Sequence, residues 1–291
     1  MTDSVPTGRY SHLDPRTAAL LDLSDDQRIA EIQSDKWINY SAASNVIARL
    51  EGLMNYPRVV RPPSLLVIGE SNQGKSALIQ RFMSDHPAYD NPDGENVVVP
   101  VIRINAGHPD PALFFQSILK QIFADYRQSD SWKALQERVG ELLPRLGVRL
   151  LIIDDINNYI SGPYNQQKKL MVALRKTSGD LHLPIAGFGM QDAKSAVATD
   201  VQLDNRFRKL ELPRWTYGEE WRRLLKTFEM MLPLHEPSKL AGKSMARKLH
   251  GMTGGVLGDL WSLLNAAAVH AVQTGTERID DAGLNAARDE F

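Results

Sequence analysis

The chain has 291 residues, of which 43% are hydrophobic and 24% are charged, and its formal net charge is −1. This length and composition predict a globular protein with a substantial core, built as one large domain or as a core with a smaller appended domain. The absence of cysteine excludes disulfides and thiolate catalysis. The near-neutral charge excludes a strong global attraction to polyanions, so nucleic-acid binding would need a local basic patch or repetition in an oligomer.

Helices and strands are predicted to alternate through the first three quarters of the chain. A helical pattern over residues 37–54 comes first. Apolar runs then predict five strands, over residues 64–69, 97–105, 149–154, 183–189 and 208–213. Helical patterns lie between the strands, over residues 76–85, 111–127, 131–146 and 165–180. This alternation predicts an α/β fold with a mostly parallel five-stranded sheet that helices cover on both faces.

The pattern changes after Pro213, because residues 216–291 read as helices with breaks at residues 232–237 and 253–255. No internal repeat or low-complexity tract interrupts the chain. We therefore expect three parts, which are an N-terminal extension over residues 1–30, a core over residues 31–215 and a small helical domain over residues 216–291.

A phosphate-binding pattern follows the first predicted strand. The segment GESNQGKS, residues 69–76, matches G-x-x-x-x-G-K-S/T between a strand and a helix. Glycines allow the loop to turn its N–H groups toward phosphates, Lys75 can reach the β- and γ-phosphates, and the Ser76 hydroxyl can bind Mg²⁺. The pattern predicts a nucleotide site. The residues expected to contact the nucleotide are Gly69, Glu70, Ser71, Asn72, Gln73, Gly74, Lys75, Ser76 and Ala77.

Two aspartates end the apolar strand at residues 149–154. A phosphate loop needs a carboxylate on another strand to hold Mg²⁺, and Asp154 is the candidate; the alternative is a helix cap or a solvated strand end. Asp155 stands where ATPases with a strand inserted between these two strands usually carry a Glu that orients the attacking water. Aspartate is one methylene shorter, so the water must sit closer or hydrolysis slows.

Five segments together resemble a known family: KWINY (36–40), RPPSLLVIGESNQGKS (61–76), LLIIDDINN (150–158), GFGMQDA (187–193) and QLDNRF (202–207). The set is similar to TniB, the AAA+ ATPase of transposons that move with a DDE transposase. TniB is related to TnsC and more distantly to MuB. The similarity runs from about residue 20 to beyond residue 280.

The resemblance implies an AAA+ P-loop core with a helical lid, and an ATP-dependent regulator of transposition. Such proteins assemble as rings or helical filaments on duplex target DNA and recruit the transposase. The implied cofactors are ATP and Mg²⁺. The implied partners are double-stranded DNA, further copies of the chain, a TniA-like DDE transposase and a TniQ-like target-selection adaptor. The implied location is the bacterial cytoplasm, in association with the nucleoid.

The resemblance also implies roles for single residues. Residues 69–76 would form the Walker A loop, and Asp154 with Asp155 the Walker B end, so Lys75 and Asp155 would act in hydrolysis. Arg206 would be an arginine finger that reaches the γ-phosphate held by a neighbouring subunit, with Arg208 as the competing candidate. Either arginine could instead be a surface residue. Trp37 and Tyr40 would lie near the adenine, although core packing explains such a pair equally well.

Three departures from the family pattern predict slow hydrolysis. Met190 stands where family members commonly have Thr, near the γ-phosphate sensor of AAA+ proteins, and Met is a weak acceptor. The segment at residues 253–261 begins like a sensor-2 helix but has no Arg to face the site. With the short Asp155, these features predict a slow, assembly-dependent ATPase that acts as a timer.

Basic residues that follow the second and third strands are candidates for DNA contacts, although each could be part of a solvated helix face. The better cluster spans residues 168–176, with two basic pairs seven residues apart on one helix. Contacts to phosphate would be independent of sequence and sensitive to salt. A duplex is favoured because no aromatic interleaving suggests base stacking. The candidates are Lys120, Arg127, Lys133, Lys168, Lys169, Arg175 and Lys176.

Two other functions fit the same motifs. The chain could be an AAA+ adaptor that loads a replicative helicase, or a nucleotide-gated interaction module that does not hydrolyse ATP. Binding to transposase rather than to helicase would separate the first alternative from the transposition regulator. Assembly on duplex DNA would argue against the second.

Overall fold

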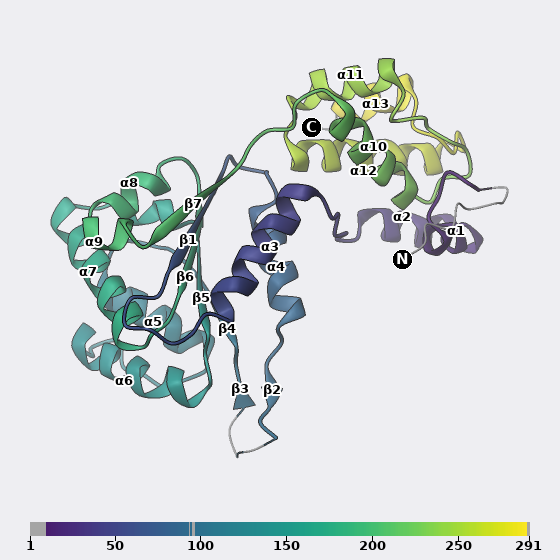
Figure 1. Cartoon of the computed structure of the whole chain (residues 1–291). Coiled ribbons are helices and arrows are strands. Elements are labelled where there is room, and N and C mark those ends of the chain that lie inside the picture. The colour runs from purple at the N-terminus through teal and green to yellow at the C-terminus, as the bar shows by residue number, and fades with distance from the viewer. Residues whose placement is uncertain (1–9, 93, 95–96, 290–291) are drawn as a thin grey trace. The chain divides into compact units, whose positions relative to one another are not determined.

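The computed structural model describes residues 10–92, 94 and 97–289, and the chain divides into two compact units (Figure 1). One unit contains residues 41–213, and the other combines the described residues up to 40 with those from 214 onward. This division differs from the one expected from the sequence. Residues 10–30 of the expected extension, and residues 31–40 of the expected core, group with the C-terminal helices; residues 1–9 lie outside the described part.

The first unit is built on a five-stranded sheet in the order β4–β5–β6–β1–β7, in which all neighbouring strands are parallel (Figure 1). The strands are β1 (Ser64–Gly69), β4 (Val101–Asn105), β5 (Leu150–Asp154), β6 (Ile185–Gly189) and β7 (Phe207–Leu212). The predicted α/β class with a five-stranded sheet is therefore confirmed. Strand β6 lies between β1 and β5, which is the inserted strand that the sequence reasoning assumed for this branch of ATPases.

The pattern of apolar residues follows each strand's place in the sheet. The three central strands, β1, β5 and β6, are buried along their whole length, as strands with helices on both faces require. The edge strands β4 and β7 instead carry partly or fully exposed residues, among them Arg103 on β4 and Arg208 on β7. Charged side chains on an edge strand also discourage pairing with another sheet.

The predicted strand over residues 97–105 is split at Pro100. Its first part, β3 (Val97–Val98), pairs antiparallel with β2 (Tyr89–Asp90) in a separate small sheet, and β4 begins at Val101. Proline has no N–H to continue a ladder. Its carbonyl oxygen accepts hydrogen bonds from the N–H groups of Arg149 and Leu150, which starts the β4–β5 pairing.

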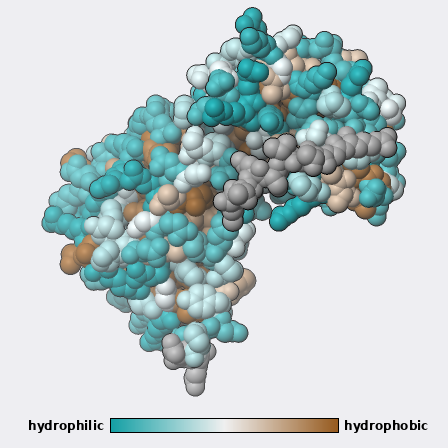
Figure 2. Space-filling model, turned by 45° about the vertical axis from the view of Figure 1, so that its right-hand side comes forward, coloured by the Kyte–Doolittle hydropathy of each residue, from teal (hydrophilic) through white to brown (hydrophobic). Residues whose placement is uncertain are grey.

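Helices surround the five-stranded sheet (Figure 1). They are α3 (Ser41–Met54), α4 (Lys75–Asp85), α5 (Pro111–Gln121), α6 (Trp132–Arg145), the 3₁₀-helix η2 (Ile156–Ile160), α7 (Tyr164–Asp180), α8 (Ala193–Ala198) and α9 (Val201–Asp204). Helix α5 ends six residues earlier than predicted, because Phe123 adopts a left-handed conformation with φ of 54°. Phe123 is 96% exposed. Elsewhere, on the face seen in Figure 2, hydrophobic residues are scattered among hydrophilic ones.

The second unit is helical. Its elements are α1 (Pro15–Ala19), the 3₁₀-helix η1 (Leu20–Asp22), α2 (Asp25–Gln33), α10 (Glu219–Met231), α11 (Lys243–Thr253), α12 (Leu257–Gln273) and α13 (Asp281–Asp289). Ile32 of α2 is fully buried in the same core as Trp221 and Leu264, which explains why the N-terminal residues belong to this unit. No single helix among the described residues is long and apolar enough to cross a membrane, although α11 and α12, bent by 116°, pass such a test together.

An ion pair also ties the N-terminal and C-terminal parts of the helical unit together. The Arg28 guanidinium, only 3% exposed, donates to both carboxylate oxygens of Glu277 at 2.8 and 2.6 Å and to Asp25 at 2.8 Å. Burial alone would raise the pKa of Glu277. Hydrogen bonds from Arg28 and from the His235 N–H outweigh this effect, so the pKa of Glu277 lies below its usual value. The pair therefore stabilises the folded unit.

We expect Glu277→Gln to destabilise the helical unit by about 3–5 kcal/mol, since it leaves a buried guanidinium without its main partner. Four of the five tryptophans (Trp37, Trp215, Trp221 and Trp261) belong to this unit, so tryptophan fluorescence during urea unfolding reports mainly on it. Asp25→Asn is the matched control, because that carboxylate is 70% exposed, and it should cost no more than about 1 kcal/mol. Equal effects of the two variants would contradict this role of Glu277.

The same pair predicts a pH dependence. Because the pKa of Glu277 is lowered on folding, its contribution is present above the unfolded-state pKa of about 4.3 and is lost as the pH falls through the folded-state value. The difference in unfolding free energy between the unsubstituted chain and Glu277→Gln should therefore shrink in acid.

Candidate nucleotide site

The phosphate loop connects β1 to α4. Gly74, the N-cap of α4, has φ of 80°, and Asn72 has φ of 64°, so the loop contains two left-handed residues that curl it around the start of the helix. A Cβ on Gly69 would lie only 3.2 Å from the Cβ of Leu212, because β7 runs close beside the end of β1. The loop residues differ in their exposure to solvent. The buried ones are Gly69, Gln73 and Lys75, and Gly74 is partly exposed. The exposed ones are Glu70, Ser71, Asn72, Ser76 and Ala77.

Lys75 points back into this loop. Its ammonium donates to the carbonyl oxygens of Gly69 at 2.8 Å and Glu70 at 2.7 Å, and the residue is only 8% exposed. Burial lowers the pKa of Lys75, and the negative charges of Asp155 and Asp154 oppose that effect. The charges of Lys75 and of the two aspartates therefore act on one another.

Asp154 ends β5 as a buried carboxylate. It is 4% exposed and is paired in register with Asn105 of β4. Its Oδ1 accepts the N–H of Asp155 at 3.1 Å, and its Oδ2 accepts a hydrogen bond from the Arg103 guanidinium at 2.6 Å. The sequence reasoning missed Arg103, although a single charged residue within the apolar strand segment VIRIN was a visible signal.

Asp155 has a left-handed backbone, with φ of 52° and ψ of 38°, at the N-cap of η2. This region of φ/ψ space is sparsely used by residues other than glycine, and Asp and Asn adopt it more readily than most. The side chain is exposed at the carboxyl end of the sheet. The backbone conformation gives a physical reason for aspartate at a position where glutamate was expected.

Two asparagines join the strand ends around the aspartates. The Asn157 Oδ1 accepts the N–H of Met190, just after β6, at 3.1 Å, and the Asn158 Nδ2 donates to the Ala106 carbonyl, just after β4, at 3.0 Å. A Cβ on Gly189 would come within 2.7 Å of the Asn157 Oδ1, so this contact needs the glycine. Sequence reasoning gave neither asparagine a role.

The donor set at this end of the sheet fits a magnesium ion that accompanies a nucleotide. The Ser76 hydroxyl, in the first turn of α4, and the Asp154 carboxylate are oxygen ligands of the type that Mg²⁺ prefers. The anionic Asp155 and the cationic Lys75 complete a site suited to a bound cation and a phosphate chain, respectively.

Arg206 lies at the opposite end of β1. Its carbonyl oxygen accepts the N–H of Ser64, the first residue of β1, whereas the phosphate loop begins at Gly69, the last. The two ends of such a strand are roughly 16 Å apart. The structure therefore does not bring Arg206 together with Lys75 and the aspartates of its own sheet.

The surroundings of Arg206 are cationic. The pKa of Arg206 is lowered mainly by burial and then by the positive charges of Arg175 and Arg61. The negative charge of Asp200 opposes this shift. Its Nη1 is buried and has no hydrogen-bond partner among the described residues. Asp200 is itself paired with Arg175 at 3.0 Å. The competing candidate, Arg208, is exposed on β7.

Trp37 and Tyr40 belong to the helical unit. The ring of Tyr40 packs edge-on against Trp215, with centroids 5.2 Å apart, and burial raises the pKa of Tyr40 to about 12. This packing favours the structural interpretation of Tyr40, and contact of either residue with adenine stays a prediction.

Most of the DNA-contact candidates are exposed. They are Lys120 on α5, Arg127 after it, Lys133 on α6, and Lys168, Lys169 and Lys176 on α7. Arg175 is different, because it is half-buried and donates to Asp200. Two exposed aromatic residues, Phe123 and Trp132, accompany the basic residues of α5 and α6, which the sequence reasoning did not anticipate.

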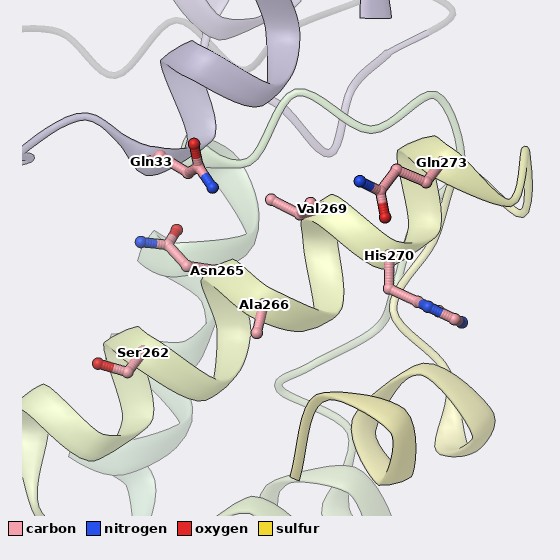
Figure 3. Close-up of a pocket in the computed structure, with 7 residues that line it drawn as sticks. All are labelled: Gln33, Ser262, Asn265, Ala266, Val269, His270 and Gln273. Atoms are coloured by element: carbon pink, nitrogen blue, oxygen red, sulfur yellow. The ribbon is translucent and has the colours of Figure 1, made fainter. Parts of the chain in front are cut away.

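A separate pocket of about 280 Å³ lies in the helical unit (Figure 3). Its lining comes from α2 and α12 and comprises Gln33, Ser262, Asn265, Ala266, Val269, His270 and Gln273. Figure 3 shows Gln33 and Asn265 on facing helices, with His270 turned away from them. This lining contains no lysine or arginine to neutralise a phosphate chain, so the phosphate loop is the better nucleotide site.

The comparisons with known proteins agree with this geometry. Residues 28–217, more than half of the chain, match the family described as "Bacterial TniB protein". No curated protein matches the chain. Cdc6p from Pyrobaculum aerophilum has a similar structure, with a TM-score of 0.62 and 12% identity over 89% of this chain and 70% of that one.

Other solved structures share the fold. The Aeropyrum pernix ORC1 protein, solved in complex with DNA, gives a TM-score of 0.56 at 14% identity over 90% of this chain and 69% of that one. Domain III of the Thermotoga maritima replication initiation protein DnaA gives a TM-score of 0.53 at 15% identity, over 96% of this chain and 98% of that one. These likenesses show an AAA+ P-loop fold, and the family match shows that the chain belongs to the TniB family.

Proposed function

We propose that this TniB-family chain is an ATP-dependent regulator of DNA transposition. It assembles as a ring or helical filament on duplex target DNA, recruits a DDE transposase and disassembles after slow ATP hydrolysis. The observation that carries the proposal is the separation of the phosphate loop from Arg206, at the two ends of β1, within a TniB-family chain. A site divided in this way needs a second copy of the chain to become complete.

The residues around the loop bind and orient the nucleotide. The backbone N–H groups of residues 69–76 cradle the phosphates, and Lys75, released from its loop carbonyls, neutralises the β- and γ-phosphates. Ser76 and Asp154 would hold Mg²⁺, which would supply charge neutralisation at the phosphate oxygens. Asp155 orients the attacking water, and Arg206 of a neighbouring subunit would stabilise the charge that develops on the γ-phosphate.

Slow turnover follows from the same residues. Asp155 is shorter than the usual glutamate, and Met190, 42% exposed after β6, provides no strong polar contact for the γ-phosphate. The helical unit would serve as the lid of the ATPase core. The long-lived ATP-bound assembly is the state that recruits transposase, with a TniQ-like protein as a further partner.

Binding to duplex DNA would come from the exposed lysines of α5, α6 and α7, repeated in each subunit. One subunit offers few phosphate contacts, whereas an assembly multiplies them. The shared fold with ORC1, a protein solved with DNA, is compatible with such binding. Phe123, in the turn after α5, and Trp132, at the start of α6, would add apolar contacts.

Electron microscopy with a non-hydrolysable ATP analogue and duplex DNA tests the proposal directly. We expect ordered rings or filaments with the analogue, and none with the Lys75→Ala variant, which cannot hold the phosphates. Raised salt should dissolve the DNA-bound assemblies, because phosphate contacts release counterions. Discrete monomers under all conditions would contradict the proposal. Selective co-purification with a replicative helicase instead of a DDE transposase would favour the helicase-loader alternative.

A further inference from the structure

The magnesium-binding candidate Asp154 already has a cationic partner within the fold. The Nη2 of Arg103 lies 2.6 Å from the Oδ2 of Asp154, and this is the strongest polar contact of that carboxylate. The aspartate side chain is 5% exposed, whereas that of Arg103 is 35% exposed. A short, charge-assisted hydrogen bond to a buried carboxylate is among the stronger contacts available to a protein.

The register of the sheet creates this pair. Arg103 is paired with Ile152, and Asn105 with Asp154, in the parallel β4–β5 ladder. Side chains two residues apart on a strand share a face, and so do partners in register. Arg103 therefore points to the same face as Asp154 and reaches it along the strand direction.

The contact joins one nitrogen of Arg103 to one oxygen of Asp154. Arginine can also bind a carboxylate through two parallel hydrogen bonds, and it frequently does so. Here the Asp154 Oδ1 accepts the Asp155 N–H instead, and the Arg103 Nε is buried without a hydrogen-bond partner among the described residues. An unpaired buried donor is unfavourable. Strand β4 is an edge strand, and 35% of the Arg103 side chain is exposed to solvent.

A metal ion and Arg103 would compete for one carboxylate. Both are cations, and like charges that share a single buried anion repel each other strongly in the low dielectric of a protein. Mg²⁺ bound next to Asp154 would therefore weaken the hydrogen bond between Arg103 and Asp154, and the guanidinium would in turn oppose binding of the ion.

We propose that Arg103 is an internal competitor of Mg²⁺ for Asp154. The guanidinium occupies the carboxylate until the Mg²⁺–nucleotide complex displaces it toward solvent, so Arg103 sets the magnesium concentration that nucleotide binding requires. The inference rests on the proposed nucleotide site, and it assigns Arg103 a regulatory role and no part in the chemistry. If Arg103 only positioned Asp154, its removal would weaken metal binding instead.

The test is the Mg²⁺ dependence of binding of a fluorescent ATP analogue, without DNA, in the Arg103→Gln variant. We expect the half-saturating Mg²⁺ concentration to fall by about tenfold or more, because the competing hydrogen bond to a charged group is removed. Arg149→Gln is the matched control. It removes the same charge at the residue that precedes β5. Arg149 donates to the carbonyl oxygens of Met54 and Tyr56 and not to Asp154. Its Mg²⁺ requirement should not change.

A second measurement uses the unsubstituted chain and so does not depend on the folding of a variant. Phenylglyoxal, an arginine-specific reagent, should modify Arg103 faster with Mg²⁺ and nucleotide than with nucleotide and EDTA, as read by mass spectrometry of the Arg103 peptide. An unchanged or higher Mg²⁺ requirement in Arg103→Gln, or equal modification rates, would overturn the inference and leave the nucleotide site intact. Failure of the unsubstituted chain to bind the analogue would overturn both.

Discussion

A mixture of Arg206→Ala and Asp155→Asn subunits should hydrolyse ATP although neither variant does so at a normal rate alone. Arg206 and the phosphate loop lie at opposite ends of β1, so a complete site would combine the loop of one subunit with the arginine of its neighbour. Loss of an arginine finger lowers turnover by about 10³- to 10⁵-fold. In a random equal mixture, about one quarter of the interfaces pair an intact Asp155 with an intact Arg206, so about a quarter of the activity should return.

The measurement is hydrolysis of radiolabelled ATP by the mixed subunits in the presence of duplex DNA. Arg208→Ala is the matched control, since Arg208 is two residues further along and exposed, and it should keep near-normal turnover. Normal turnover by Arg206→Ala would show that another residue is the arginine finger. Failure of the mixture to recover activity would argue against a site shared between subunits.

Asp155→Asn should bind ATP and assemble on DNA but lose turnover by about 10²- to 10⁴-fold, the range for removal of a general base. Asparagine also tolerates the left-handed conformation at this position, where φ is 52°, so the backbone and the η2 helix should stay in place. Single-turnover hydrolysis gives the loss, and binding of a fluorescent analogue shows that the loop still works. Normal hydrolysis by this variant would assign the water-orienting role to another residue.

Asp155→Glu is the informative partner of that variant. It restores the reach of the usual glutamate but places a less suitable residue in a left-handed conformation. If reach limits turnover, Asp155→Glu should hydrolyse ATP faster than the unsubstituted chain while unfolding at a lower temperature. The unsubstituted chain itself should turn over below about 10 per second, under the typical enzyme value. A faster rate would contradict the hypothesis that slow hydrolysis acts as a timer.

The elements around this site that could be predicted from the sequence depend on local patterns. The phosphate loop is defined by a strand, a short motif and a helix start within twelve residues, 64–75, and the structure has β1, the loop and α4 in that order. The aspartate pair ends a strand that is buried along its length. In both cases, residues close in sequence determine the geometry.

What sequence reasoning missed depends on contacts between distant segments. The Arg103–Asp154 pair requires the β4–β5 register, and the lone charge in VIRIN does not reveal that register. The grouping of residues 10–40 with the C-terminal helices depends on Ile32 and Arg28, whose partners lie about two hundred residues away or more. Pro100 had a local signal that was not used fully, since proline ends a ladder. Phe123 had none, because a left-handed backbone is unusual for a bulky residue such as phenylalanine.

The placement of the phosphate loop and Arg206 at opposite ends of β1 has a consequence for any assembly that uses both. The two interacting surfaces are different, so subunits would join head to tail, and such contacts give either closed rings or open helices. An open assembly would then have polarity. The subunit at one end would bind ATP without a neighbouring arginine, and the subunit at the other end would present an arginine with no phosphate to contact. Hydrolysis could not occur in the first of these subunits, which would give growth and loss of subunits different rates at the two ends.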